Sequence, residues 1–305
     1  MGWSARSLFD AIAQNDVDSV RSQLGNNVNP SFFPDFPTTT PIIMAVRAKF
    51  YNIIILLLQY GADLTRVDVT GQNALHHAVR CKDMISIRLL LSHNCPTEVR
   101  DNSGFTPFIL AISSNSLSMV HYFVQKGAAV YPEHGSVQTM PLVSAAYFGY
   151  LKILDYLLKV EEPNKLKKKI HINYALCMAC CRGQIDSAKM LIESGALVTR
   201  YYLYDISPLT FAIIYNQEDI VSLLLSNGAP VNDQDYRGYT PLMFSVMFDN
   251  PSVVSKLLWH GANPDTAAKD GQTTAETIAI NMRRETIWRM LYTWKQDVVP
   301  SVFGL

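Results

Sequence analysis

The chain has 305 residues, and its 26 lysines and arginines balance its 26 aspartates and glutamates. This balance excludes a net charge that would draw nucleic acid or an anionic membrane surface. With 49% hydrophobic and 17% charged residues, the composition also excludes intrinsic disorder as the main state.

Apolar runs and cysteines indicate the class of protein. No run approaches the roughly 20 apolar residues of a membrane span, so we expect none. The first residues, MGWSAR, lack the apolar core of a secretory signal. Five cysteines without the spacing of a disulfide framework favour reduced thiols. We therefore expect a cytoplasmic protein, with the nucleus as the alternative compartment.

A short motif recurs along the chain at a nearly constant interval. It reads TTTPIIMAV from residue 38, GQNALHHAV from 71, GFTPFILAI from 104 and GYTPLMFSV from 238. We call the residue at the proline position of each copy its anchor, and successive anchors are 33 or 34 residues apart. The anchors are Ser7, Pro41, Ala74, Pro107, Pro141, Ala175, Pro208, Pro241 and Thr274.

A second landmark keeps the same interval. A glycine or asparagine followed by a small residue stands 20 residues after most anchors. These positions are Gly61, Asn94, Gly127, Gly195, Gly228 and Gly261. Among the copies from Pro41 to Pro241, only the one anchored at Pro141 lacks the landmark, and it has Glu161, Glu162 and Pro163 there instead.

Each copy predicts two helices joined by a tight turn. Threonine before the anchor proline can cap a first helix, because Pro tolerates the first helical turn. Alanine four positions after the anchor lets neighbouring helices approach. Asparagine, glycine or aspartate usually stands eight positions after it and tolerates a left-handed turn, for which Lys49 and Lys82 are poorer residues. Apolar positions such as Ile54, Leu57 and Leu58 then predict a second helix.

Together these features resemble the ankyrin repeat family over roughly residues 4 to 294. The resemblance implies an all-α repeat solenoid of about nine units, each a helix-turn-helix with a β-hairpin-like finger, and degenerate capping units at the ends. We predict a single domain, 1–294, whose units start near residues 4, 38, 71, 104, 138, 172, 205, 238 and 271. A C-terminal tail, 295–305, follows.

Candidate chemical groups are few. The pair His76–His77 could suggest a metal or a general base, but the resemblance gives His76 a structural role in tying neighbouring fingers together. Cys177 and Cys180 take core positions of a repeat helix, whereas Cys181 projects toward the groove. No phosphate loop, metalloprotease helix or nucleophile elbow occurs. We predict no enzyme, no cofactor and no metal.

A lysine-rich run from Lys165 to Lys169 replaces a regular finger. We interpret it as a solvated loop. The alternative is a docking site for an acidic peptide or phosphate. The run is short and lacks aromatic residues, which disfavours nucleic acid as a partner.

The resemblance also implies where a partner would bind. The family holds partners mainly on a concave face, made by finger tips and by first-helix residues six and seven positions after the anchor. In the early copies these positions are small or polar, as at Arg47, Ala48 and Arg80. Later copies carry aromatic and apolar residues there, and an exposed apolar patch is costly unless it is used. The predicted partner-binding residues are Tyr147, Phe148, Leu203, Tyr204, Ile206, Ile214, Tyr215, Tyr236, Arg237, Tyr239, Met247 and Phe248.

Two alternatives remain for this aromatic face. The inner helices could press closely enough to bury it, or the tail with Trp294 and Phe303 could fold back over it. The resemblance further makes Asn232 a candidate for asparaginyl hydroxylation, and Asn29 stands in a similar position. The alternative for Asn232 is a hairpin-stabilising asparagine.

We predict a monomeric scaffold or adaptor that binds a partner protein or peptide. The alternatives are a substrate-recognition subunit of a ubiquitin ligase and a pathogen effector. Only the short segment QDVVPSVFGL follows the last repeat, which is too short for the helical box of such a ligase subunit.

Overall fold

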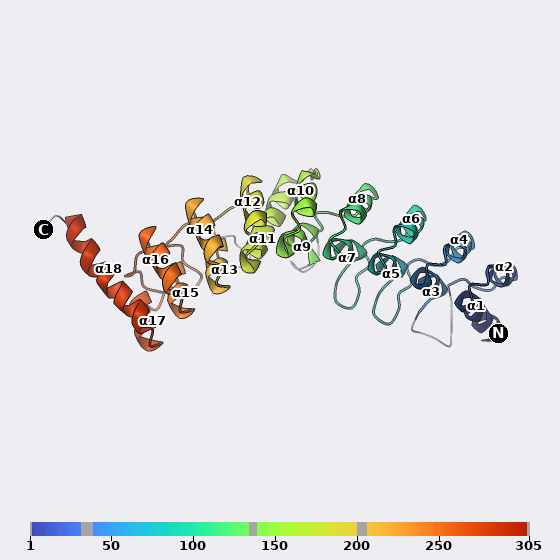
Figure 1. Cartoon of the computed structure of the whole chain (residues 1–305), viewed down its shortest axis with the longest axis horizontal. Coiled ribbons are helices and arrows are strands. Elements are labelled where there is room, and N and C mark those ends of the chain that lie inside the picture. The colour runs from blue at the N-terminus through green and yellow to red at the C-terminus, as the bar shows by residue number, and fades with distance from the viewer. Residues whose placement is uncertain (1, 32–38, 134–138, 200–205, 304–305) are drawn as a thin grey trace. The chain divides into compact units, whose positions relative to one another are not determined.

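A computed structural model describes residues 2–31, 39–133, 139–199 and 206–303. In these ranges the regular elements are helices, and no strand is assigned. The chain forms two compact units, Met1–Ser144 (unit 1) and Ala145–Leu305 (unit 2). In both, every repeat contributes a first, inner helix and a second, outer helix (Figure 1). The predicted all-α repeat solenoid is confirmed.

Unit 1 stacks its helices in two rows. The inner helices are α1 (Gly2–Ala13), α3 (Pro41–Ala48), α5 (Ala74–Arg80) and α7 (Pro107–Ser113). The outer helices are α2 (Val17–Gly25), α4 (Tyr51–Gln59), α6 (Met84–Ser92) and α8 (Leu117–Gln125). Inner helices pack in order, α1 on α3, α3 on α5 and α5 on α7, while α2 packs on α4 and α4 on α6. Each repeat therefore buries its apolar face against its neighbours.

Unit 2 repeats this plan. Its inner helices are α11 (Lys165–Arg182), α13 (Pro208–Ile214), α15 (Pro241–Met247) and α17 (Ala275–Asn281). Its outer helices are α10 (Leu151–Lys159), α12 (Ile185–Glu193), α14 (Glu218–Ser226), α16 (Pro251–Trp259) and α18 (Glu285–Phe303). The boundary between the units falls within α9 (Pro141–Phe148), whose last residues belong to unit 2. The helices of each row pack in order from α10 to α18 and from α11 to α17.

The inner helices begin as the motif predicts. The hydroxyl oxygen of Thr40 accepts a hydrogen bond from the Ile43 N–H at 3.3 Å, and Pro41 takes the first helical position. Thr240 caps α15 in the same way through the Met243 N–H at 3.2 Å. Such caps satisfy backbone donors that have no partner inside the helix.

Alanines at the fourth position after the anchor form the narrow contacts between inner helices. The fully buried ones are Ala45, Ala78, Ala111, Ala145, Ala179 and Ala212. Apolar residues of the outer helices, such as Ile54 and Leu57, fill the space between the rows and are also fully buried. The core is therefore a continuous layer between inner and outer helices within each unit.

Every repeat turns between its two helices at a residue in the left-handed region. Eight of these residues stand eight positions after their anchors, namely Asn15, Lys49, Lys82, Asn115, Gly149, Gly183, Asn216 and Asp249. In the last repeat the residue is Arg283, nine positions after Thr274. The predicted turn is confirmed, including at Lys49 and Lys82, where φ is 59° and 50°. The fold imposes this conformation even on residues that disfavour it.

The fingers close by hairpin-type hydrogen bonds. In unit 1 the Asp68 N–H donates to the Gln72 carbonyl at 2.9 Å, and the Asn102 N–H of the next finger donates to the Thr70 carbonyl at 2.9 Å. In unit 2 the Asp235 N–H donates to the Tyr239 carbonyl at 3.0 Å. Neighbouring fingers are thus linked through their backbones.

The lysine-rich run does not form the predicted loop. Lys165 to Lys169 make the first turns of α11, an 18-residue helix whose start is capped by Asn164, which accepts from the Lys167 N–H at 3.0 Å. The Lys168 ammonium donates to the carbonyls of Leu158 and Val160, at 2.7 and 3.0 Å. This lysine satisfies acceptors at the end of α10, so the helix extends because its first turns are bonded to the preceding outer helix.

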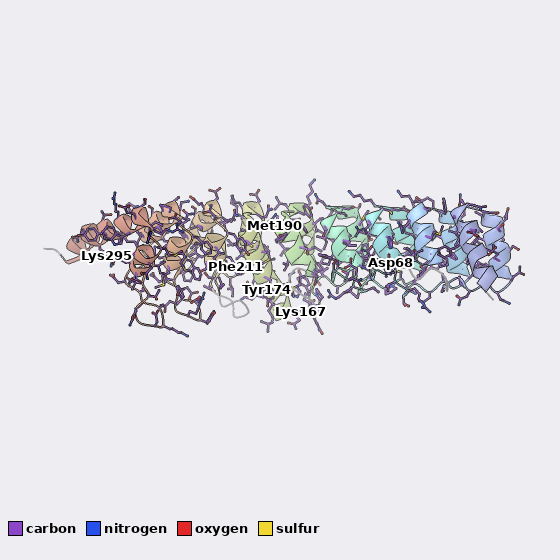
Figure 2. All side chains as sticks on the ribbon, turned by 90° about the horizontal axis from the view of Figure 1, so that it is seen from below. Asp68, Lys167, Tyr174, Met190, Phe211 and Lys295 are labelled. Carbon is purple, nitrogen blue, oxygen red and sulfur yellow. The ribbon has the colours of Figure 1, made fainter. Side chains whose placement is uncertain are left out.

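The outer helix of the last repeat, α18, continues past the predicted boundary at residue 294. The backbone of α18 is helical through Phe303. At its centre Lys295, labelled in Figure 2, donates to Asp265 and to Glu276, each at 2.7 Å. These ion pairs join α18 to the last finger and to α17. Within the described residues, no helix combines the length and apolar character of a membrane span.

Candidate functional site

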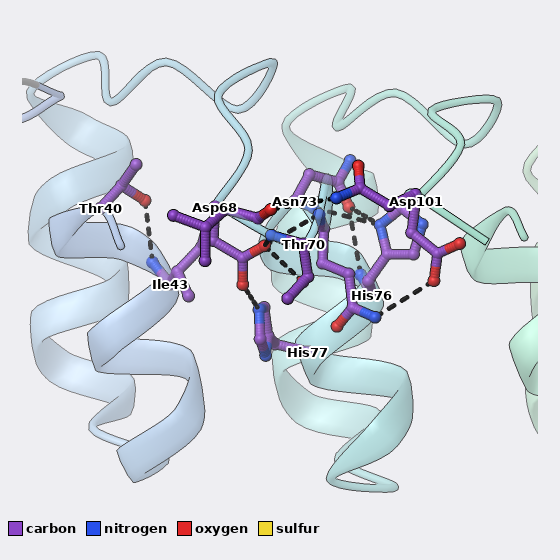
Figure 3. A network of polar contacts seen from close by, with 11 residues as sticks. Thr40, Ile43, Asp68, Thr70, Asn73, His76, His77 and Asp101 are labelled. Carbon is purple, nitrogen blue, oxygen red and sulfur yellow. Dashed lines mark hydrogen bonds and ion pairs between the residues drawn. The ribbon is translucent and has the colours of Figure 1, made fainter. Parts of the chain in front are cut away.

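His76 joins two neighbouring repeats of unit 1. Its Nε2 donates to the Phe105 carbonyl of the next repeat, 3.1 Å away, so Nε2 carries the ring proton. Its Nδ1 then accepts from the Asn73 N–H at 3.2 Å and also lies 2.6 Å from the Asn73 Oδ1 (Figure 3). Burial lowers the pKa of His76, so the ring is neutral at pH 7. The expected structural role of His76 is confirmed by these contacts.

His77 belongs to the same polar network. Its Nε2 lies 2.8 Å from the carboxylate of Asp68 (Figure 3). Burial is the main cause that lowers the pKa of His77, with the positive charges of Arg47 and Arg80 acting in the same direction. Burial would raise the pKa of Asp68, but hydrogen bonds from Thr70, Gln72 and His77 outweigh it and lower the pKa. The neutral His77 imidazole donates to the Asp68 carboxylate and so holds the finger that contains Asp68 on α5.

Two of the three cysteines of α11, Cys177 and Cys180, lie in the core, as predicted. Cys177 and Cys180 are 3% and 0% exposed. Burial raises the pKa of Cys177 to about 12 and that of Cys180 well above its ordinary value. Both thiols therefore stay protonated and pack as small apolar groups.

The inner face of unit 2 carries a row of exposed side chains at the seventh position after successive anchors. We call Phe148, Arg182, Tyr215 and Phe248 the inner row. The three aromatic residues are 42%, 50% and 49% exposed, and Arg182 is exposed as well. Each stands at the end of an inner helix, where the left-handed turn begins. The repeat therefore places one large side chain per unit along this face.

Contacts join members of the inner row to the preceding inner helix. The Arg182 guanidinium lies over the Tyr147 ring, 4.8 Å from its centroid, and Tyr147 packs edge-on against Phe148 at 5.2 Å. The Cys181 thiol of the preceding repeat is the main cause that raises the pKa of Tyr215. Arg182 and Tyr215 therefore interact with the preceding repeat and still expose part of their surface.

A second group of side chains, which we call the finger cluster, lies in the same unit and consists of Tyr236, Arg237 and Tyr239. The Arg237 guanidinium sits 5.3 Å from the ring centroid of Tyr236 and 5.0 Å from that of Tyr239. Its Nε also lies 3.5 Å from the buried carboxylate of Asp235. Tyr236 is 61% exposed. Stacked arginine and tyrosine are residue types that dominate protein interfaces.

The other predicted partner-binding residues divide by burial. The half-buried ones are Ile206, Ile214, Tyr147, Tyr239 and Met247. Leu203 and Tyr204 lie outside the described residues.

The sequence analysis missed Arg182 and Ile280, which take the seventh and sixth positions after Ala175 and Thr274. Ile280 is 56% exposed beside a recess of about 270 Å³ that Asn281 and Thr277 also line. The repeat register itself contained this signal, because both residues occupy the positions used to choose the others.

The early repeats show a polar inner face. Arg47, Ala48 and Arg80 are exposed, whereas Ser113 and Ser114 are half-buried. Among the described residues, the exposed aromatic side chains of the inner face are therefore a property of unit 2.

Asn232 is exposed but is engaged in hydrogen bonds. Its amide nitrogen donates to the Gly261 carbonyl at 3.0 Å, and its oxygen accepts from the Asn263 N–H at 2.8 Å. Both partners belong to the next repeat. These contacts support the hairpin-stabilising interpretation, and hydroxylation of Asn232 stays a prediction.

Comparison with known proteins bears on the whole chain. The family model described as ankyrin repeats (3 copies) matches residues 8–95, 68–134, 83–169, 142–235 and 209–300. An ankyrin repeat protein of Fowlpox virus (strain NVSL) is 26% identical over 203 residues, 65% of this chain and 57% of that protein. The B-cell lymphoma 3 protein homolog of Mus musculus is 29% identical over 161 residues, 52% of this chain and 36% of that protein.

A third relative is named as a cation channel. The transient receptor potential cation channel subfamily A member 1 of Homo sapiens is 23% identical over 167 residues, 52% of this chain and 15% of that protein. The chain spans less than two thirds of the length of each of these three relatives.

Proposed function

We propose, from the premise that this chain belongs to the ankyrin-repeat family, that it binds a partner protein through the inner face of unit 2. Ankyrin repeats are a protein–protein interaction module. The inner row is the observation that supports this surface, because three aromatic side chains there are 42–50% exposed. Exposed aromatic rings in register are costly to keep in water unless a partner covers them.

The role that fits this surface is that of an adaptor. The polar network around His76 and the buried thiols of α11 are explained by their contacts within the repeats, and we expect no catalysis from them. The inner row and the finger cluster, by contrast, expose side-chain surface that a ligand can contact. Aromatic and arginine side chains supply most of the free energy of typical interfaces.

The test is affinity capture with the full chain. Wild type is compared with a Tyr215→Ser, Phe248→Ser double variant, and with a Trp259→Ser control. Trp259 is 80% exposed but ends the outer helix α16, away from the inner row. Truncating an interface aromatic costs ~2 kcal/mol at a hot spot, which is about 30-fold in affinity per site.

The expected result is that wild type and the Trp259→Ser control capture the same proteins and the double variant loses them. Because the replaced residues are exposed, the melting temperature of the double variant should stay close to that of wild type. A double variant that melts normally and still captures every specific partner at full yield would show that the inner row is not the binding surface.

A further inference from the structure

The inner row has a spacing that restricts what can lie along it. Its members stand at the same position of four successive repeats, and α11, α13 and α15 pack on each other in order. Packed helices lie about 8–10 Å apart. Arg182 over the Tyr147 ring links α9 into the same series. A ligand running along the row therefore meets one large side chain about every 8–10 Å.

This interval matches one backbone conformation best. A polyproline II helix has three residues per turn and a rise of about 3.1 Å, so one of its faces recurs about every 9.3 Å. A β-strand presents the same face about every 6.7 Å. An α-helix completes a turn in about 5.4 Å, so every second contact would fall between the rings. Only the polyproline II repeat meets each member of the row once.

The chemistry of the row suits such a ligand. Polyproline II segments have no internal hydrogen bonds, so their carbonyls are free to accept, and aromatic-lined grooves bind them. Tyr215 offers an exposed ring in the row, and its hydroxyl is a hydrogen-bond donor at neutral pH. Tyr236 offers a second exposed tyrosine on the finger side. Because the ligand is already extended and stiff, binding orders it at little entropic cost.

The charge of the row points to an acidic residue in the ligand. Arg182 is exposed and makes no ion pair with any described residue. The acid nearest to it in the sequence, Asp186, lies 4.0 Å from Lys189. The α9–α11 end of the row therefore carries uncompensated positive charge.

We propose that the inner row binds a proline-rich segment in the polyproline II conformation, with an apolar side chain at every third residue and a carboxylate facing Arg182. This inference rests on the proposed function, because it names the ligand class of the same surface.

The test is a selection from a phage-displayed library of random 12-residue peptides against the full chain. Phages that bind the Tyr215→Ser, Phe248→Ser variant are removed first. The expected survivors are proline-rich, repeat an apolar residue every three positions and carry Asp or Glu near one end. A synthetic peptide of the enriched sequence should bind at least tenfold more weakly to Phe248→Ser. An Arg182→Glu chain should prefer the same peptide with lysine in place of its acidic residue.

The selection distinguishes failure of this inference from failure of the proposed function. Enriched peptides that depend on the row but show helical or alternating spacing, or ignore the Arg182 charge reversal, overturn this inference and leave the inner face as a binding surface. A selection that yields no peptide dependent on Tyr215 and Phe248 overturns both. Melting curves of each variant separate loss of binding from loss of folding.

Discussion

At the scale of single residues, the fold fixes a left-handed backbone conformation at the turn between the two helices of each repeat. Lys49 and Lys82 adopt the left-handed conformation that other repeats give to asparagine or glycine. A non-glycine residue pays about 1–2 kcal/mol for this conformation. The buried alanines and capped helices around the turn outweigh that cost, so the backbone is set by packing.

Replacing Lys49 or Lys82 with glycine should stabilise the protein. Relief of the left-handed strain exceeds the added freedom of the unfolded chain, and we expect a gain of about 0.5–1 kcal/mol per site. Urea unfolding followed by circular dichroism measures it. Lys189→Gly, inside α12, is the matched control and should lose about 1 kcal/mol. Equal losses at all three positions would contradict the assigned role of the turn.

His76 should make stability depend on pH. Its folded pKa lies below the ordinary value of 6.5, because burial disfavours the charged ring. Its contribution is therefore fully present above pH 6.5 and is lost as the pH falls from there through the lowered folded value, since only the unfolded chain takes up the proton. His77 shifts in the same direction.

We expect the free energy of unfolding to fall between pH 7 and pH 5, and His76→Gln to reduce this slope. Denaturant titrations across that pH range give the measurement. His93, exposed at the end of α6, supplies the control variant, His93→Gln. If His76→Gln leaves the slope of the free energy of unfolding against pH unchanged, His76 is not the source of the pH dependence.

At the scale of elements, α11 shows why a lysine run misleads. The run reads as a solvated loop because of its charge, whereas the decisive signals were the capping residue Asn164 and the absence of glycine or proline from residue 164 to 182. Lys168 has a structural task at the end of α10. Lys165 is exposed at the first position of the helix, where its charge opposes the helix dipole.

Lys165→Glu and Lys168→Met should therefore change stability in opposite directions. The first places a negative charge at the helix start and should stabilise by about 0.3–1 kcal/mol. The second leaves the Leu158 and Val160 carbonyls without their donor and should destabilise by about 1–3 kcal/mol. Thermal unfolding of the two variants checks the signs. If both substitutions change the stability only slightly, the result would favour interpreting the lysine run as plain solvated surface.

At the scale of the whole molecule, the anchors and the glycine landmark were enough to predict the repeats, their caps and their turns. The same register predicted the exposed positions of Phe148, Tyr215 and Phe248. What it could not predict were the contacts that a side chain makes with the preceding repeat, such as Arg182 over the Tyr147 ring or Lys168 with the Leu158 carbonyl. Such contacts depend on side-chain rotamers and on where each helix ends, and the spacing of the anchors specifies neither.

Because contacts join neighbouring repeats, damage should stay local. His76→Ala removes the bridge from α5 to the Phe105 carbonyl, a loss of about 1–3 kcal/mol. Hydrogen–deuterium exchange should become faster in α3 to α8 and stay unchanged in α13 to α18. Faster exchange throughout would instead indicate that the chain opens as one cooperative body.

Two of the turns hold glycine against a neighbouring side chain. A Cβ atom at Gly149 or Gly183 would meet the terminal amide of Gln184 or Gln217, the glutamine that follows the turn of the next repeat. That amide is the far end of a flexible side chain and can shift, so the contact by itself does not require glycine. The other repeats hold asparagine, lysine, aspartate or arginine at the same backbone angle. Saturation mutagenesis should therefore accept asparagine at these two turns as well, with the glutamine displaced.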